Sequence, residues 1–288
     1  MCASTDAKLL LTLLVPLVLL VGAPDAAEGG SPTLVVCAPG YPGSTAEAQP
    51  AMDALAAAVA GAAGTGPDGL EAAYFETEAG GLAALAEPDA GLALLTLPFF
   101  LEHRQDLALD PVLLAVPAGR QAAEPWTLVA GAGLVAAPSD LAGWTLVSLA
   151  GHSERFVRGP ALGGWGELPG DLTVEFSGRV LSALRKAARG EKVAVLLDAE
   201  QAAALDDLPF VRDLEVVHRS PPLPVSVLAA VAGRVPTERL AKLTGALRSL
   251  DGRPEAAEAL AGVRIERFEP VDREALARAE AAFAGVGE

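Results

Sequence analysis

Short apolar runs alternate with longer alanine-rich or amphipathic segments along most of the chain. The longer segments have helical spacing, and several begin at a Ser and end at a Gly or Pro, as helices do. Strands that alternate with helices in this way are typical of βαβ units, so the pattern predicts an α/β fold with parallel sheets. The expected strands are 33–39, 70–75, 90–98, 110–119, 125–135, 172–176, 192–198 and 214–220; the expected helices include 44–63, with a capping box of Ser44 and Glu47, and 177–190, capped by Ser177.

The stretch "LAGHSERFVRG", residues 149–159, follows the apolar run "GWTLVSL" directly. It predicts a strand that ends in a glycine turn, followed by a helix that opens at Ser153 and continues past Pro160. A helix start at the carboxyl end of a strand is where many α/β proteins hold an anion. The proline cluster "SPPLP" at 220–224 then interrupts the alternation, before a last series of one strand, two helices, a short segment and a terminal helix.

Residues 1–27 have the features of a secretory signal peptide. Lys8 supplies the positive charge, residues 9–21 form the apolar stretch, and small residues follow. The apolar stretch is shorter than the roughly 20 residues that a membrane span needs. We expect cleavage near Ala26 or Ala27 and a soluble mature protein that is periplasmic or secreted. An uncleaved N-terminal anchor is the alternative.

Composition and short motifs exclude several classes of function. The net charge of −16 speaks against a nucleic-acid surface, because phosphate backbones require clustered Lys and Arg. No G-x-S-x-G, H-E-x-x-H or Walker sequence is present, so we expect neither an enzyme nor catalytic residues. The histidines, His103, His152 and His218, are too scattered along the chain for a metal site. Cys37 fits a small hydrophobic residue that closes a strand.

Four segments carry a resemblance to a known family. They are "PSDLAGWTLVSL" (138–149), "ALRKAARGEKVAVLLD" (183–198), "RSPPLPVSVLAAV" (219–231) and "LRSLDGRPEAAEALAGVRIERFEPVD" (247–272). In this order they resemble the periplasmic substrate-binding proteins of the phosphate, phosphite and phosphonate ABC transporter family, a branch of the type II periplasmic binding fold. The resemblance spans about residues 33–272.

The resemblance implies a two-lobed periplasmic binding protein type II fold with a two-strand hinge. Lobe one would comprise residues 31–122 plus 224–288, and lobe two residues 123–223. Two crossing strands permit hinge closure over a ligand while each lobe stays rigid. A protein of this kind is a monomer that binds a small molecule and delivers it to an ABC-type or other envelope permease. No cofactor is implied.

The same resemblance places the ligand at loops that follow strands, outside the carboxyl ends of parallel strands. These loops are 37–45, 76–81, 96–100 and 149–156. Phe99 and Phe100 also fit the core of a lobe, and His152 also fits a surface turn. The candidate ligand-binding residues are Tyr41, Ser44, Thr77, Phe99, Phe100, His152, Ser153 and Arg155, and no metal ligands are expected.

The sequence departs from the family where an oxyanion would bind. "TLPFF" lacks the usual small polar residue and tyrosine, and "AGHSERF" replaces a turn rich in serine and threonine. Each candidate helix start also carries its own carboxylate, from Glu47, Glu78 or Glu154. One like-charge repulsion at about 4 Å costs roughly 4 kcal/mol at an effective dielectric of 20.

We therefore expect an extracytoplasmic solute-binding protein whose ligand is neutral, or apolar and amphipathic like a lipid or sterol. An oxyanion binder of the phosphate or phosphonate type is one alternative. A ligand-free sensor or scaffold lobe is the other.

Overall fold

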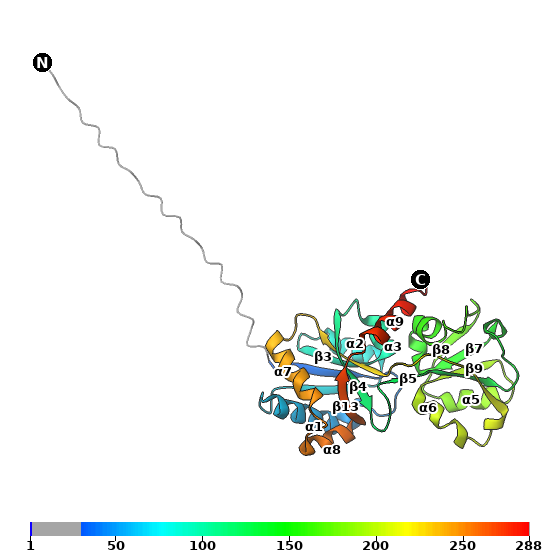
Figure 1. Cartoon of the computed structure of the whole chain (residues 1–288), viewed down its shortest axis with the longest axis horizontal. Coiled ribbons are helices and arrows are strands. Elements are labelled where there is room, and N and C mark those ends of the chain that lie inside the picture. Colours follow the sequence, from blue (N-terminus) through cyan, green and yellow to red (C-terminus); the bar gives the residue numbers. More distant parts are fainter. Residues whose placement is uncertain (2–29, 288) are drawn as a thin grey trace.

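The computed structural model of the chain describes Met1 and residues 30–287. Two α/β bodies lie side by side, joined by extended segments (Figure 1). The leader expected over residues 1–27 lies outside the described residues, Met1 apart. Among the described residues, no helix has the length and apolar character that crossing a membrane requires.

The first body is built on a six-stranded sheet of mixed direction, with the order β13-β4-β12-β3-β1-β2. β1 is parallel to β2 and β3, whereas β12 is antiparallel to β3 and β4. The strands expected within residues 33–119, β1 to β4, therefore run parallel as predicted, whereas β12, which returns from the other body, and β13 enter the sheet in the opposite direction. The strands are β1 (Thr33–Cys37), β2 (Glu71–Phe75), β3 (Ala90–Thr96), β4 (Leu109–Pro117), β12 (Ser226–Val231) and β13 (Ile265–Pro270).

Helices cover both faces of this sheet, and the period of two along β1 explains why. Leu34 packs in a core with Leu55 and Leu243, whereas Val35 packs on the opposite face with Leu85 and Phe99. The predicted capping box of Ser44 and Glu47 is confirmed at the start of the first helix. The helices are α1 (Thr45–Ala63), α2 (Glu78–Ala86), α3 (Leu97–His103), α7 (Thr237–Arg248) and α8 (Ala257–Gly262), with a 3-10 turn at Pro254–Ala256.

The second body has a five-stranded sheet with the order β10-β6-β9-β7-β8. β7 is parallel to β8 and β9, and β6 is antiparallel to β9 and β10. The strands are β6 (Thr127–Gly131), β7 (Thr145–Ser148), β8 (Thr173–Phe176), β9 (Val193–Leu197) and β10 (Leu214–Arg219). The helices are α4 (Glu154–Phe156), α5 (Val180–Ala188) and α6 (Ala199–Ala203), with 3-10 turns at Pro138–Leu141, Leu149–His152, Leu205–Asp207 and Val211–Asp213.

Two local expectations for this body are wrong. After Ser153 the chain forms one α-helical turn and then a π-helical turn, Val157–Ala161, because Pro160 cannot continue the regular pattern. The N-cap of α5 is Arg179 rather than Ser177. The Ser177 hydroxyl instead accepts a hydrogen bond from the Arg179 backbone N–H and shapes the turn before the helix.

The chain crosses between the bodies at a two-stranded ribbon, β5 (Ala123–Glu124) with β11 (Leu223–Pro224). Strands of the six-stranded sheet come from the sequence proposed as lobe one, and those of the five-stranded sheet from lobe two. The first body is thus lobe one and the second lobe two. The C-terminal helix α9 (Arg273–Ala284) follows β13 of lobe one but lies against the π-helical turn of lobe two. A side chain at Gly159 would lie 2.4 Å from the Ala282 carbonyl oxygen, so only glycine permits this approach.

Candidate functional site

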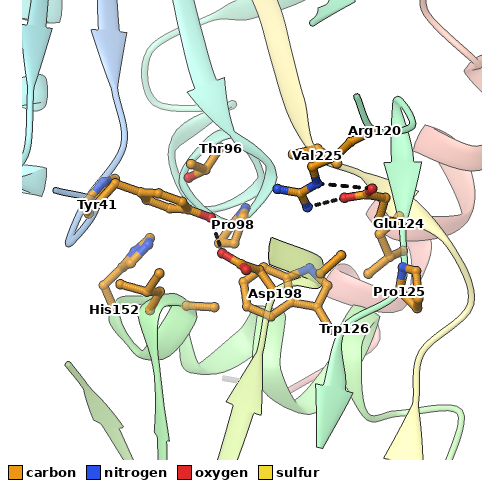
Figure 2. Close-up of a pocket in the computed structure, with 15 residues that line it drawn as sticks. Tyr41, Thr96, Pro98, Arg120, Glu124, Pro125, Trp126, His152, Asp198 and Val225 are labelled. Carbon is orange, nitrogen blue, oxygen red and sulfur yellow. Dashed lines mark hydrogen bonds and ion pairs between the residues drawn. The ribbon is translucent and has the colours of Figure 1, made fainter. Parts of the chain in front are cut away.

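A small cavity lies between the lobes, at the ends of strands from both sheets and beside the crossing ribbon (Figure 2). Its volume is about 30 Å³, which is room for one or two water molecules. The residues that line this interlobe cavity are Pro39, Tyr41, Thr96 and Pro98 of lobe one, Arg120, Glu124, Pro125, Trp126, Leu223 and Val225 around the crossings, and Leu149, Ala150, His152, Asp198 and Ala199 of lobe two.

A direct hydrogen bond joins the two lobes across this cavity. The Tyr41 hydroxyl donates to Asp198 Oδ2 at 2.6 Å, as Figure 2 shows. Asp198 is only 7% exposed and also caps α6, since its Oδ1 accepts from the Gln201 backbone N–H at 2.8 Å. Burial, and then the negative charge of Asp198, raises the pKa of Tyr41 well above its usual range. The phenol therefore stays protonated and keeps its role as the donor.

The cation of the interlobe cavity, Arg120, is already paired with carboxylates. Its guanidinium binds Glu124 through Nε at 3.2 Å and through Nη2, and its Nη1 lies 3.3 Å from Glu200 Oε2. Burial alone would lower the pKa of Arg120, but the hydrogen bond to Glu124 and the nearby acids outweigh it and raise that pKa. With Asp198 beside it, the local charge of this cavity is negative.

Two polar groups in the wall have no hydrogen-bond partner among the described residues. They are Thr96 Oγ1 and His152 Nδ1, both buried from solvent. Burial lowers the pKa of His152, so its imidazole is neutral at pH 7. Trp126 completes the wall and packs edge-on against Phe156 at 5.2 Å between ring centroids. The arrangement can bind a solute through unused hydrogen-bonding groups and an aromatic surface.

Further contacts between the lobes surround the cavity. The Ser153 hydroxyl donates to Glu102 Oε2 at 2.5 Å, and Arg264 of lobe one lies 3.6 Å from Glu200 of lobe two. The Arg155 guanidinium lies over the Phe283 ring of α9, 4.3 Å from its centroid.

The sequence-predicted site residues are distributed unevenly around this cavity. The structure brings Tyr41 and His152 together in its wall. Ser153 lies next to His152 but is 1% exposed, and its oxygen also caps α4. Arg155 faces α9 instead.

The other candidate residues cap helices or are buried in a hydrophobic cluster. Ser44 and Thr77 cap α1 and α2, where the hydroxyl oxygens accept backbone N–H bonds from Glu47 and Gly80. Phe99 and Phe100 are fully buried, in a hydrophobic cluster that includes residues of both lobes. A role for these residues in ligand contact stays a prediction.

Sequence reasoning placed a ligand loop at 96–100 without naming Thr96, and it missed Arg120, Glu124, Trp126 and Asp198. For Asp198 a signal existed: it ends the apolar run 192–198 and precedes a helical segment with Gln201 at capping-box spacing. For Arg120 and Glu124 no local pattern pointed to a site, because only the path of the crossing segment places them beside the interlobe cavity.

Comparison with known proteins agrees with this architecture. The family model described as "ABC transporter, phosphonate, periplasmic substrate-binding protein" matches residues 159–276. A comparison with curated proteins gives no match.

Several solved structures share the fold at low sequence identity. XAC2383 from Xanthomonas citri bound to ATP has a TM-score of 0.67 at 18% identity, covering 88% of this chain and 98% of that chain. PhnD1 from Prochlorococcus marinus in complex with methylphosphonate has a TM-score of 0.60 at 13% identity, covering 87% and 96%. A binding protein component of an ABC phosphonate transporter, PA3383 from Pseudomonas aeruginosa, has a TM-score of 0.59 at 15% identity, covering 89% and 91%.

These similarities define the class: the chain has the two-lobed α/β fold of periplasmic binding proteins, as the sequence predicted. The predicted resemblance to the phosphonate-type substrate-binding components of ABC transporters is confirmed. That family consists of periplasmic transporter components rather than enzymes, and its members work with a small-molecule ligand and a membrane permease.

Proposed function

We propose that the chain is an extracytoplasmic solute-binding protein that captures a small molecule between its lobes and presents it to a membrane permease. The observation that carries this proposal is the convergence of groups from both lobes on one cavity, above all Tyr41 and Asp198. A solute that bridges such groups favours the closed arrangement by its differential affinity for the two states.

The charges at the cavity favour a neutral solute over an oxyanion. Asp198 and Glu124 face it, and Arg120 is occupied by Glu124 and Glu200. A phosphonate near Asp198 would meet a repulsion of roughly 4 kcal/mol per unit charge at about 4 Å and an effective dielectric of 20. The complex of PhnD1 with methylphosphonate keeps the oxyanion as the alternative. A sterol-sized ligand finds no support in an interlobe cavity of about 30 Å³.

A thermal-shift screen with calorimetry tests the proposal. The purified protein is titrated with phosphate, methylphosphonate and a set of small neutral solutes. We expect a neutral solute to raise Tm with concentration, as ligands of the folded state do, and to reduce the radius of gyration in solution. Tyr41→Phe should weaken that binding, whereas Ser249→Ala, which removes a hydroxyl of lobe one that does not line the cavity, serves as the control. Tight methylphosphonate binding without any neutral ligand would establish the alternative.

Direct bonds between the lobes favour a second candidate, a scaffold or sensor that closes without a solute. Tyr41 binds Asp198 and Ser153 binds Glu102, so protein groups bridge the lobes by themselves. This candidate predicts a compact protein in solution whose Tm no solute in the screen changes. Solution scattering of Asp198→Asn beside the native protein would then show whether these bonds hold the lobes together.

A further inference from the structure

Lobe one contains a second cavity, about 340 Å³ in volume, more than ten times the interlobe cavity. This volume is within the range of small-molecule sites. It lies between α1, the ends of β1, β3, β4 and β12, and the connection from α8 to β13. Apolar residues form most of its wall, and the buried ones among them include Met52, Leu55, Leu94, Ala115 and Ile265. We call it the lobe-one cavity.

Small residues on the facing elements leave this space open. Ala48 and Ala51 of α1 line it, and so do Gly262 and Val263 at the end of α8. A Cβ atom at Gly262 would lie 3.4 Å from the Ala51 Cβ atom, so α8 approaches α1 closely at this edge. α1 and α8 are in contact at this edge, and the cavity lies between these helices and the six-stranded sheet.

The two cavities are neighbours that share a wall. Tyr41, Thr96, Arg120 and Val225 line both. The Thr96 hydroxyl is buried, and its oxygen has no hydrogen-bond partner among the described residues. A buried hydroxyl without a partner costs free energy, and a ligand group that bonds to it recovers that cost.

The charges around the lobe-one cavity balance within the protein. Arg120 and Arg264 are the cations of its rim, and Glu47 and Glu200 are the acids. Glu200 comes from lobe two and lies 3.3 Å from Arg120 and 3.6 Å from Arg264. Lobe closure therefore brings a carboxylate over the mouth and neutralises the cations that would otherwise attract an anion.

We propose that the lobe-one cavity binds the apolar body of a small, neutral amphipathic solute, whose hydroxyl or carbonyl group bonds to Thr96. The solute enters from the interlobe cleft, and Glu200 closes the mouth by pairing with Arg120 and Arg264. This inference rests on the proposed solute-binding function and extends it to a site inside one lobe.

Calorimetry with 1-octanol tests this, with octanoate as the charged probe of the same chain length. We expect octanol to bind at least tenfold more tightly than octanoate. Ala48→Leu, which fills the cavity, should abolish binding, and Ala54→Leu, at an exposed position of the same helix, should not. Thr96→Val keeps the shape and removes the hydroxyl, so it should weaken octanol binding about two- to tenfold, the range that one hydrogen bond contributes.

Several outcomes would overturn the inference. Octanol affinity that is unchanged in both Ala48→Leu and Thr96→Val places the alcohol elsewhere; if Ala48→Leu does not fold, Thr96→Val alone decides. A crystal grown with 8-bromo-1-octanol should show the bromine anomalous signal between α1 and β4, and a signal only elsewhere contradicts the site. If octanol fails but another solute binds in a Tyr41-dependent way, the inference fails and the proposed function stands. If no solute binds, both fail.

Discussion

The two cavities of this protein differ in almost every physical property. The interlobe cavity is small, charged and made by groups that come from both lobes, including Tyr41 and Asp198. The lobe-one cavity is large and apolar, and apart from Glu200 its lining residues belong to the proposed lobe one and the hinge. Directional polar contacts join the two lobes, whereas apolar area buried inside one lobe would supply affinity without orientation. The comparison assigns different roles to the two cavities: the interlobe cavity joins the lobes, and the lobe-one cavity offers the apolar surface that can hold a solute.

The largest effect tests whether the lobe-one cavity is truly underpacked. Leu85→Ala and Leu55→Ala remove the same atoms from fully buried positions, one in a packed core and one in the cavity wall. Leucine-to-alanine changes in cores cost about 2–5 kcal/mol. We expect Leu85→Ala to cost about 1 kcal/mol more than Leu55→Ala, because one side of Leu55 already lacks contact atoms. Urea unfolding measures the free energy of unfolding of both variants. Equal losses would contradict the inference that the wall of the lobe-one cavity is less tightly packed than the core around Leu85.

The next effect tests the charged cavity. Asp198→Asn keeps the helix cap, since Asn is as good an N-cap as Asp, but removes the charge that Tyr41 binds. The Asn amide can still pair with the Tyr41 hydroxyl, so we expect a loss of about 1 kcal/mol, the difference between a hydrogen bond to a charged group and one to a neutral group. Methylphosphonate affinity should rise at the same time, because the repelling charge is gone. Asp206→Asn, an exposed position of lobe two, is the matched control and should change neither quantity.

A smaller effect appears at alkaline pH. Burial raises the pKa of Tyr74 to about 12, and burial together with the charge of Asp198 raises the pKa of Tyr41 well above its usual value of 10.0. The folded state holds these protons more tightly than the unfolded state, so stability is lost as pH rises above 10. Absorbance titration of the two tyrosines should show no ionisation in the folded protein below about pH 11. Tyr41→Phe and Tyr74→Phe should each reduce the alkaline loss of stability, because each removes one of these phenols.

The smallest effect is at the rim between the cavities. Glu200 is 56% exposed, and exposed ion pairs contribute about 0–1 kcal/mol. Glu200→Gln should therefore change the free energy of unfolding by less than about 1 kcal/mol. It should nevertheless improve octanoate binding relative to octanol, because Arg120 and Arg264 lose their partner from lobe two. If calorimetry shows the same ratio of octanol to octanoate affinity in Glu200→Gln as in the native protein, the charges of the rim do not affect binding in the lobe-one cavity.

The sequence predicted the parts of the fold that depend on local patterns. The apolar run 33–39 became β1 and β3 formed within 90–98, and the capping box of Ser44 begins α1. The βαβ spacing of residues 33–119 gave parallel strands, but no local pattern showed that β12 would enter the same sheet antiparallel to β3 and β4. The irregular turn after Ser153 depends on the packing of Gly159 against α9, which no local pattern contains.

The site was predictable only in part, for a related reason. Tyr41 and His152 could be placed because each follows a predicted strand. Their partners could not, since Tyr41 and Asp198 are 157 residues apart and meet only when two lobes close. Phe99 and Phe100 were ambiguous for the opposite reason: aromatic residues after a strand suit a ligand wall and a core equally, and only packing distinguishes the two.

The position of α9 has a consequence for any movement of the lobes. Its helix is seated on the 157–161 turn of lobe two while the preceding strand stays in the sheet of lobe one. Glu280 of the same helix also pairs with Arg104 of lobe one, so moving the lobes apart must either break contacts of α9 with one lobe or bend the chain between β13 and α9. The C-terminal helix is therefore a third connection between the lobes, beside the two crossing strands. It restrains the separation of the lobes and so limits how far the cleft between them can open.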